Sequence, residues 1–381
     1  MAEEINIVDS NELEIIKNAL EKILYVPDRR LKPKIIEELL IYLNSRLSDD
    51  CYQIRIFIAF KQEKICGFVI SQVDPDYRSR NRKCGTFGWL NADDFLTCKG
   101  LMNACENFIR QNNIRLLRGN INFPKCLGGI GIQTVGFKEQ ILYGVAFTNP
   151  KSKILDYLEK LGYKIDTEYL CMEVTAKEWK KGKNLDKSVK ISYLSLKEMK
   201  KRKKEILDLA KNAFSAVMPD STTGESRFNE IIEIYSQVPK LFYKLEKNFN
   251  AENHSNIPEF LDVWKNSDLE NSITWAPFAI HRDTNEILGV IFSLPDLYQL
   301  WLNEPITRDN VDTAMVKSGY TGKGIFSSLN NIGQLTLGFN GVNYFEGTTI
   351  WSLNQDALCS IMPHCKTNRK FVVFQKRIKK N

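Results

Sequence analysis

Two segments about 225 residues apart share one pattern and divide the chain into similar halves. Residues 57–60 and 65–71 are apolar runs separated by a charged turn, and residues 278–281 and 287–293 repeat this arrangement. Apolar runs of this length joined by a short polar turn are typical of β-hairpins. The period is too long for a stacked repeat, so we interpret the echo as a tandem duplication of one domain. A chance similarity of two hairpins is the alternative.

The elements expected around the two hairpins follow the same order in each half. Helices are expected where apolar residues recur at helical spacing, and strands where apolar runs are short. The expected helices cover residues 11–24, 33–47, 94–111 and 325–337, and the further strands cover residues 85–90, 115–121, 169–174, 311–316, 342–350 and 371–374. We therefore predict an α/β fold of the mixed-sheet α+β kind, built from two tandem domains.

Length and charge distribution place the domain boundary at mid-chain. The chain has 381 residues, more than the roughly 250–300 over which one hydrophobic core keeps growing. Residues 177–204 hold twelve Lys or Arg and three acidic residues. The net charge of this segment, +9, exceeds the net charge of +7 of the whole chain. We predict a first domain at 1–176, a basic linker at 177–190 and a second domain at 191–381. The basic segment fits a solvated linker and helix face, and contact with nucleic acid is possible but not favoured.

Cysteine and histidine usage argues against a metal centre. The nine cysteines include no Cys-x-x-Cys pair, which favours reduced thiols. A zinc site would need Cys359, His364 and Cys365 with a distant fourth ligand, and ordinary core or surface roles are favoured for them. No apolar run approaches the ~18 residues of a membrane span, and the start of the chain is acidic. We expect a cytoplasmic protein without membrane contact or metal.

Residues 316–329 read as a strand, a glycine-containing loop and a helix. Such a turn directs successive backbone amides and a helix N-terminus at an anion, and a diphosphate is the expected guest. The Gly-x-x-x-x-Gly-Lys-Ser/Thr pattern is not met because Gly324 follows Lys323. The Gly-x-Gly-x-x-Gly pattern is not met because Ser327 replaces the third glycine.

This segment resembles the acyl-CoA loop of the GCN5-related N-acetyltransferase (GNAT) superfamily, where a Val-x-Pro-x-Tyr-Arg-Gly-Lys-Gly-Ile-Gly-like loop joins a strand to a helix. The superfamily's Asn-x-x-Ala pattern also has a counterpart, which begins at Asn354. The resemblance covers residues 191–379 and extends weakly to the first half. It implies that the Val316 backbone holds the pantetheine arm and that Asn354 contributes to cofactor binding and catalysis. The residues it places around the diphosphate are Thr321, Gly322, Lys323, Gly324 and Ile325.

The resemblance implies an N-acyltransferase, most simply an N-acetyltransferase. The co-substrate would be acetyl-CoA or another acyl-CoA, and the acceptor a primary amine of a small molecule or peptide. Glu346 is our candidate for the base that removes a proton from the amine, and a packed ion pair or solvated edge is the alternative. His281 fits a surface or core role better than that of a base.

Three departures from the superfamily pattern leave other functions open. Thr321 stands where Arg or Gln is usual, Phe326 replaces a small residue, and Ile361 occupies the place of a tyrosine that often acts as general acid. One alternative is therefore a catalytically degenerate tandem scaffold that binds a ligand or partner. A third is tRNA-linked aminoacyl or acyl transfer, suggested by the basic run at 200–204.

The first half differs at the position equivalent to the glycine loop. Asp93 and Asp94 would lie at a helix N-terminus, where they cap the helix and repel a diphosphate. We expect this domain not to bind CoA in the usual way. Loops at 119–124 and 127–131 could shape an acceptor site, with ordinary turns as the alternative. Residues 214–262, with Tyr235, Phe242, Tyr243 and the nearby Trp264, could form acceptor walls or simply core.

Overall fold

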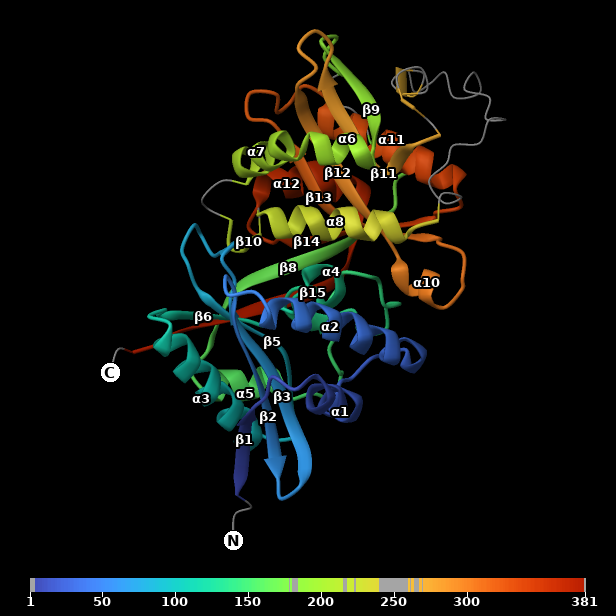
Figure 1. Cartoon of the computed structure of the whole chain (residues 1–381). Coiled ribbons are helices and arrows are strands. Elements are labelled where there is room, and N and C mark those ends of the chain that lie inside the picture. The colour runs from blue at the N-terminus through green and yellow to red at the C-terminus, as the bar shows by residue number, and fades with distance from the viewer. Residues whose placement is uncertain are drawn as a thin grey trace. The chain divides into compact units, whose positions relative to one another are not determined.

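The computed structural model describes residues 4–177, 179, 184–214, 218–222, 224–239, 260, 262–263, 267–268 and 270–379. They form an α/β fold with mixed sheets, which confirms the expected fold class. The chain has two compact units. Figure 1 labels most of their helices and strands. Unit 1 comprises residues 1–171, 349–354 and 368–381, and unit 2 comprises residues 172–348 and 355–367. The units interleave along the chain, whereas the domains expected from the sequence are each continuous.

Unit 1 is built on a sheet whose strands follow the order β1-β2-β3-β5-β6-β15-β8. Neighbours from β1 to β5 pair antiparallel, and β5 and β6 pair parallel. The strands are β1 (Ile5–Asp9), β2 (Gln53–Lys61), β3 (Lys64–Val73), β4 (Tyr77–Arg78), β5 (Gly85–Ala92), β6 (Leu116–Gly119), β7 (Ile132–Val135), β8 (Lys164–Val174) and β15 (Cys365–Arg377). The helices are α1 (Leu13–Ile23), η1 (Arg29–Leu31), α2 (Lys32–Leu47), α3 (Phe95–Gln111), α4 (Lys125–Gly128) and α5 (Ile154–Lys160).

The C-terminal strand completes the core of unit 1. Val372 and Phe374 of β15 belong to the same buried cluster as Leu101 and Cys105 of α3. In β15, Phe374 is in register with Gly119 of β6. The apolar residues at helical spacing in α3 therefore face the core, as expected. This core also includes residues from the C-terminal strand.

Unit 2 repeats the element order of unit 1. Its strands follow the order β9-β11-β12-β13-β14, antiparallel except for the parallel pair β13–β14. The strands are β9 (Val189–Ser195), β10 (Ser221–Thr222), β11 (Ser272–His281), β12 (Ile287–Pro295), β13 (Arg308–Val316) and β14 (Tyr344–Trp351). The helices are α6 (Leu196–Lys201), α7 (Lys203–Ala213), α8 (Glu225–Gln237), α10 (Leu297–Trp301), α11 (Ile325–Phe339), α12 (Gln355–Ile361) and η4 (Met362–His364). Both expected hairpins are present, as β2–β3 and β11–β12.

Three further observations concern the thiols, membrane-spanning helices and groups of metal ligands. All nine cysteines are free thiols. No helix in the described part of the chain has the length and apolarity to cross a bilayer. The described residues also contain no group of three or more His, Cys, Asp or Glu side chains placed to hold a metal ion.

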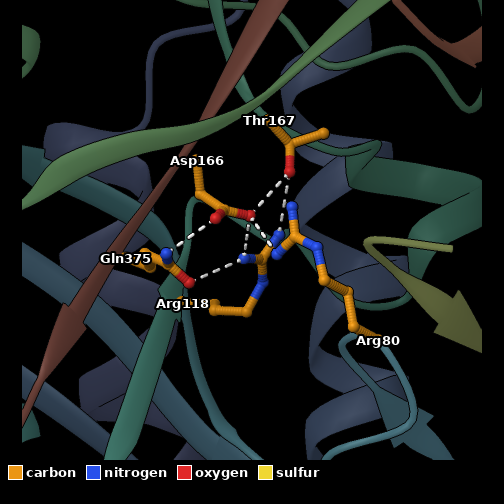
Figure 2. Close-up of polar contacts among 5 residues, drawn as sticks. All are labelled: Arg80, Arg118, Asp166, Thr167 and Gln375. Atoms are coloured by element: carbon orange, nitrogen blue, oxygen red, sulfur yellow. Dashed lines mark hydrogen bonds and ion pairs between the residues drawn. The ribbon is translucent and has the colours of Figure 1, made fainter. Parts of the chain in front are cut away.

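A buried polar network joins three neighbouring strands of unit 1 (Figure 2). The Arg118 guanidinium on β6 is fully buried and lies 2.6 Å from the Asp166 carboxylate on β8. Gln375 of β15 donates to Asp166 at 2.6 Å and accepts from Arg118 at 3.2 Å. Arg80 lies 2.8 Å from the same carboxylate, and Thr167 donates to it at 2.9 Å. The network thus satisfies a buried charge with groups from β6, β8 and β15.

Burial alone would raise the pKa of Asp166, but hydrogen bonds from Arg118 and Arg80 outweigh it and hold the pKa below its usual value of about 3.9. Because the folded-state pKa is lowered, the ionised carboxylate stabilises the fold above the unfolded-state pKa. This contribution is lost as the pH falls through the lower, folded-state value.

We expect Arg118→Met to destabilise the protein by about 3 kcal/mol near neutral pH, because it leaves a buried carboxylate with too few partners. The stability of this variant should also fall less on acidification below about pH 4. Urea unfolding at several pH values measures both effects, and Arg29→Met, an exposed arginine, is the control. Equal stability of the two variants would contradict a stabilising role for the network.

Candidate functional site

The loop after β13 depends on three glycines with a left-handed backbone. Gly319, Gly322 and Gly324 have φ values of 86°, 75° and 76°. Other residues are strained in this region. A Cβ atom at Gly319 or Gly322 would meet no atom within 4 Å, so backbone conformation and not space requires glycine there.

Helix α11 begins directly after the loop, and no side chain caps its N-terminus. Gly324 is the N-cap residue, and no side-chain hydrogen bond caps the helix. The N–H of Ser328 bonds to the Gly324 carbonyl at 3.1 Å, and the N–H groups of residues 325–327 precede this first helical bond. Backbone amides and the positive end of the helix dipole there suit an anion.

Lys323 adds a cation to this loop. Its Nζ lies 4.3 Å from the centre of the Tyr320 ring and 3.9 Å from the Asp186 carboxylate. The Asp186 N–H also donates to the Lys323 carbonyl at 3.3 Å. The Lys323 side chain is 40% exposed, so an arriving anion can compete with Asp186 for it.

The large Phe326 side chain packs against a neighbour on the flank of the helix. Its ring lies edge-on to Trp179, with centroids 5.4 Å apart, and Trp179 stacks on His364 at 4.8 Å. The Asn331 side chain bonds to both the N–H and the carbonyl of Trp179, at 2.8 Å and 3.1 Å. Trp179 falls within the segment that we interpreted as a solvated linker, yet it is only 4% exposed.

The parallel pair β13–β14 ends early. Pairing covers residues 308–311 and 344–347, and both strands continue beyond it. On the opposite edge of β13, Phe292 pairs with Thr313 and Ser293 with Val311, so Asp312 is an extra residue. A bulge of this kind bends the strand. The two strands therefore leave their shared ladder after Val311, and the backbone of 312–316 runs on toward the glycine loop.

Ionisable side chains gather beside this point. The Asp312 carboxylate lies 2.5 Å from the guanidinium of Arg227 on α8, which also binds Glu230 at 2.9 Å. Glu346, our candidate base, is fully buried and accepts a hydrogen bond from the Tyr344 hydroxyl at 2.5 Å. The next position along β14, Thr348, donates to Asn310 at 2.7 Å.

The other candidate residues have different placements. His281 is half-buried, and its Nδ1 accepts from the N–H groups of Asp283 and Thr284, so it caps a turn. Tyr235 is buried and donates to the Ser293 carbonyl at 2.9 Å, which is a core role. Asn354 follows β14 in the segment grouped with unit 1, so its part in the site stays a prediction. Phe242, Tyr243 and Trp264 lie outside the described residues.

The equivalent helix of unit 1 is capped by its own carboxylate. Asp94 is the N-cap residue of α3, accepts from the Thr97 N–H at 2.9 Å and pairs with Lys61. Burial, followed by the charge of Asp94, raises the pKa of the neighbouring Asp93. An anion at this helix end would meet negative charge in place of open amides.

Side chains also close the gap between β5 and β6 of unit 1. Their parallel pairing covers residues 85–87 and 117–119. Beyond it, the Trp89 N–H donates to the Asn122 side chain at 2.6 Å, and the Trp89 indole donates to the Phe123 carbonyl at 2.8 Å. A Cβ atom at Gly88 would come within 2.0 Å of the Ile121 carbonyl, so the backbones touch there. Hydrogen bonds and close backbone contact therefore bridge β5 and β6 beyond their paired residues.

We expect Gly324→Ala to destabilise unit 2 by about 1 kcal/mol, because alanine is strained at φ 76°. Gly338 is an exposed position near the end of α11, with no atom within 4 Å of an added Cβ. Gly338→Ala should therefore stabilise by about 0.5–1 kcal/mol. Thermal unfolding of the two variants tests this contrast, and equal effects would contradict the assigned backbone conformation.

No family model matches the sequence, and no curated protein does either. Several solved structures match the fold. A tandem GNAT protein from the clavulanic acid biosynthesis pathway has 9% identity and a TM-score of 0.55, with 99% of both chains covered. A glucosamine N-acetyltransferase region of a fungal β-N-acetylglucosaminidase has 13% identity and a TM-score of 0.54, and the match spans 99% of this chain but only 38% of that one. A conserved protein of unknown function from Enterococcus faecalis V583 has 9% identity and a TM-score of 0.54, and the match covers 99% of this chain and 73% of that one. The chain therefore has the fold of a tandem GNAT protein.

Proposed function

We propose that this protein is an N-acyltransferase that moves an acyl group from acetyl-CoA or another acyl-CoA to a primary amine, with unit 2 as its catalytic unit. One observation carries the assignment to unit 2: the N-terminus of α11 has no side-chain cap, whereas Asp94 caps the equivalent α3. The diphosphate of CoA needs the amides that α11 offers. The GNAT fold supports the general activity.

Chain lengths support this placement. The arm of CoA between phosphorus and sulfur is a chain of roughly thirteen bonds with two amides, equivalent to four or five extended residues, or about 15 Å. Val316, at the start of the loop, lies five residue steps beyond Val311, where pairing with β14 ends. These five span about 16 Å at strand spacing. A diphosphate held at the loop would thus put the thioester near Val311, in the strand region where Glu346 also lies.

The proposed reaction needs little from the protein beyond alignment and proton removal. The amine nitrogen forms a bond to the thioester carbonyl carbon, and the carbon–sulfur bond then breaks to release the CoA thiolate. A free alkylamine has a pKa near about 10, so the nitrogen must lose a proton to attack. Glu346 is the proposed acceptor of that proton, directly or through the Tyr344 hydroxyl bonded to it. Backbone N–H groups of β13 would stabilise the oxyanion.

The acceptor is proposed to be a small molecule or peptide amine. Two carboxylates, Asp312 and Glu230, pair with Arg227 in this region, and Glu346 adds a buried carboxylate on β14, which favours a cationic partner. Transfer guided by tRNA is less favoured, because Arg202 and Lys203 in the basic run pair with Glu205 and Glu225. A scaffold without catalysis is an outcome of the tests below.

Titration calorimetry with acetyl-CoA tests the premise. We expect binding by the wild-type protein, and at least a tenfold loss for Gly324→Val, because a strained, bulky residue moves the loop amides. Gly338→Ala on the same helix should bind as the wild type does. Absence of heat at millimolar acetyl-CoA would leave only the scaffold alternative.

Glu346→Gln tests the catalytic role. With an amine found by following thiol release across a panel of amines, we expect kcat to fall by about 10²–10⁴-fold, since the amide cannot accept the proton. Acetyl-CoA affinity should be unchanged, because Glu346 is not placed at the loop. Wild-type kcat in this variant would assign proton removal to another group or to water.

A further inference from the structure

Unit 1 contains a cavity beside the closed gap between β5 and β6. Its volume is about 50 Å³, and its fourteen lining residues include Trp89 and Asn91 of β5, Asn120 and Asn122 after β6, and Phe147. A single water needs about 10–15 Å³ of such volume, so the cavity has room for several waters or one small functional group. The cavity is therefore large enough for one functional group of a ligand and too small for a whole substrate.

The wall of this cavity carries no ionised side chain. Among the fourteen lining residues, the polar ones are asparagines, Thr148, Ser152 and Tyr25, and the others are apolar or glycine. A buried charge without a partner is costly, so this wall rejects ions and accepts neutral hydrogen-bonding groups. Its composition contrasts with the charged residues around Asp312 in unit 2.

Several polar groups of the wall keep hydrogen-bonding capacity. The Asn120 side-chain oxygen is buried and has no hydrogen-bond donor within the described part of the chain. Thr148 accepts from the Gln133 N–H at 3.0 Å and retains its hydroxyl proton to donate. Asn91 donates to the Trp89 carbonyl at 3.0 Å, and its own oxygen is an acceptor for a further donor. Because the terminal torsion of asparagine is soft, Asn120 can turn toward a group that enters.

These polar groups match an amide. An amide offers one carbonyl acceptor and up to two N–H donors, and the wall offers a hydroxyl donor and asparagine oxygens as acceptors. Trp89 and Phe147 also line the cavity and add aromatic surface against which a planar group can pack. We infer that the unit 1 cavity is a binding site for the amide group of an uncharged small molecule. The site is distinct from the CoA site proposed for unit 2, and its test does not depend on that proposal.

Three probes of nearly equal shape separate charge from size: acetamide is neutral, acetate is an anion and acetamidinium is a cation. The indole N–H signal of Trp89 in the full-length protein reports binding by NMR, because this side chain lines the cavity. We expect acetamide to shift the signal saturably with a millimolar dissociation constant, as befits a ligand of four heavy atoms. The two ions should bind at least about tenfold more weakly. Equal responses to all three probes, or none to acetamide, would overturn the proposal.

Asn120→Leu removes the buried oxygen that has no donor among the described residues, and it should abolish the acetamide response without lowering the melting temperature. Asn44→Leu, at an exposed position on α2, is the matched control and should bind acetamide as the wild type does. Wild-type binding by a folded Asn120→Leu would overturn the proposal.

Asn91→Asp gives a second test if Asn120→Leu does not fold. This nearly isosteric change places a carboxylate in the wall, so preference should switch from acetamide to acetamidinium. An unchanged preference would show that the probes bind elsewhere and would overturn the proposal. Acetyl-CoA binding at unit 2 should be unaffected in every variant.

Discussion

Open backbone amides at the start of α11 are the interaction on which the proposed chemistry depends. A helix N-terminus leaves donors that a side chain, water or a ligand must satisfy. Here the N-cap is Gly324, which has no side chain to offer, and its left-handed backbone turns the chain from the loop into the helix. The same glycine thus both forms the turn and leaves the amides uncapped, as the proposed diphosphate site requires.

The two units show how one fold diverges through few residues. In unit 1, Asp94 replaces the open cap, and Trp89 with Asn122 fills the gap between the parallel strands. In unit 2, the bulge at Asp312 bends β13 after Val311, where its parallel pairing with β14 ends. Strand order is the same in both units, so the differences described here lie in a helix cap, a bulge and side chains between strands.

Local sequence predicted the elements well because their signals are local. The hairpins, α3 and α11 follow from apolar spacing and turns, and the glycine loop from its strand–loop–helix context. Trp179 was missed because a single aromatic among lysines has no periodicity, and its burial depends on Asn331 and Phe326 far along the chain. The grouping of residues 368–381 with unit 1 also depends on contacts between residues far apart in the sequence. The pairing of Gln375 with Arg118 joins residues 257 positions apart, and no local pattern encodes it.

Charge separates the ligands that we propose for the two units. In unit 2, Asp312 and Glu230 both pair with Arg227, and burying such a charged cluster has a desolvation cost that a folded core alone does not require. The unit 1 cavity has the opposite character, since its wall carries no ionised side chain and the Asn120 oxygen finds no donor among the residues that the structure describes. An unsatisfied buried amide also lowers stability. Both features run against the most stable packing, and both become explicable if each unit binds a ligand, a cationic amine in unit 2 and a neutral amide in unit 1.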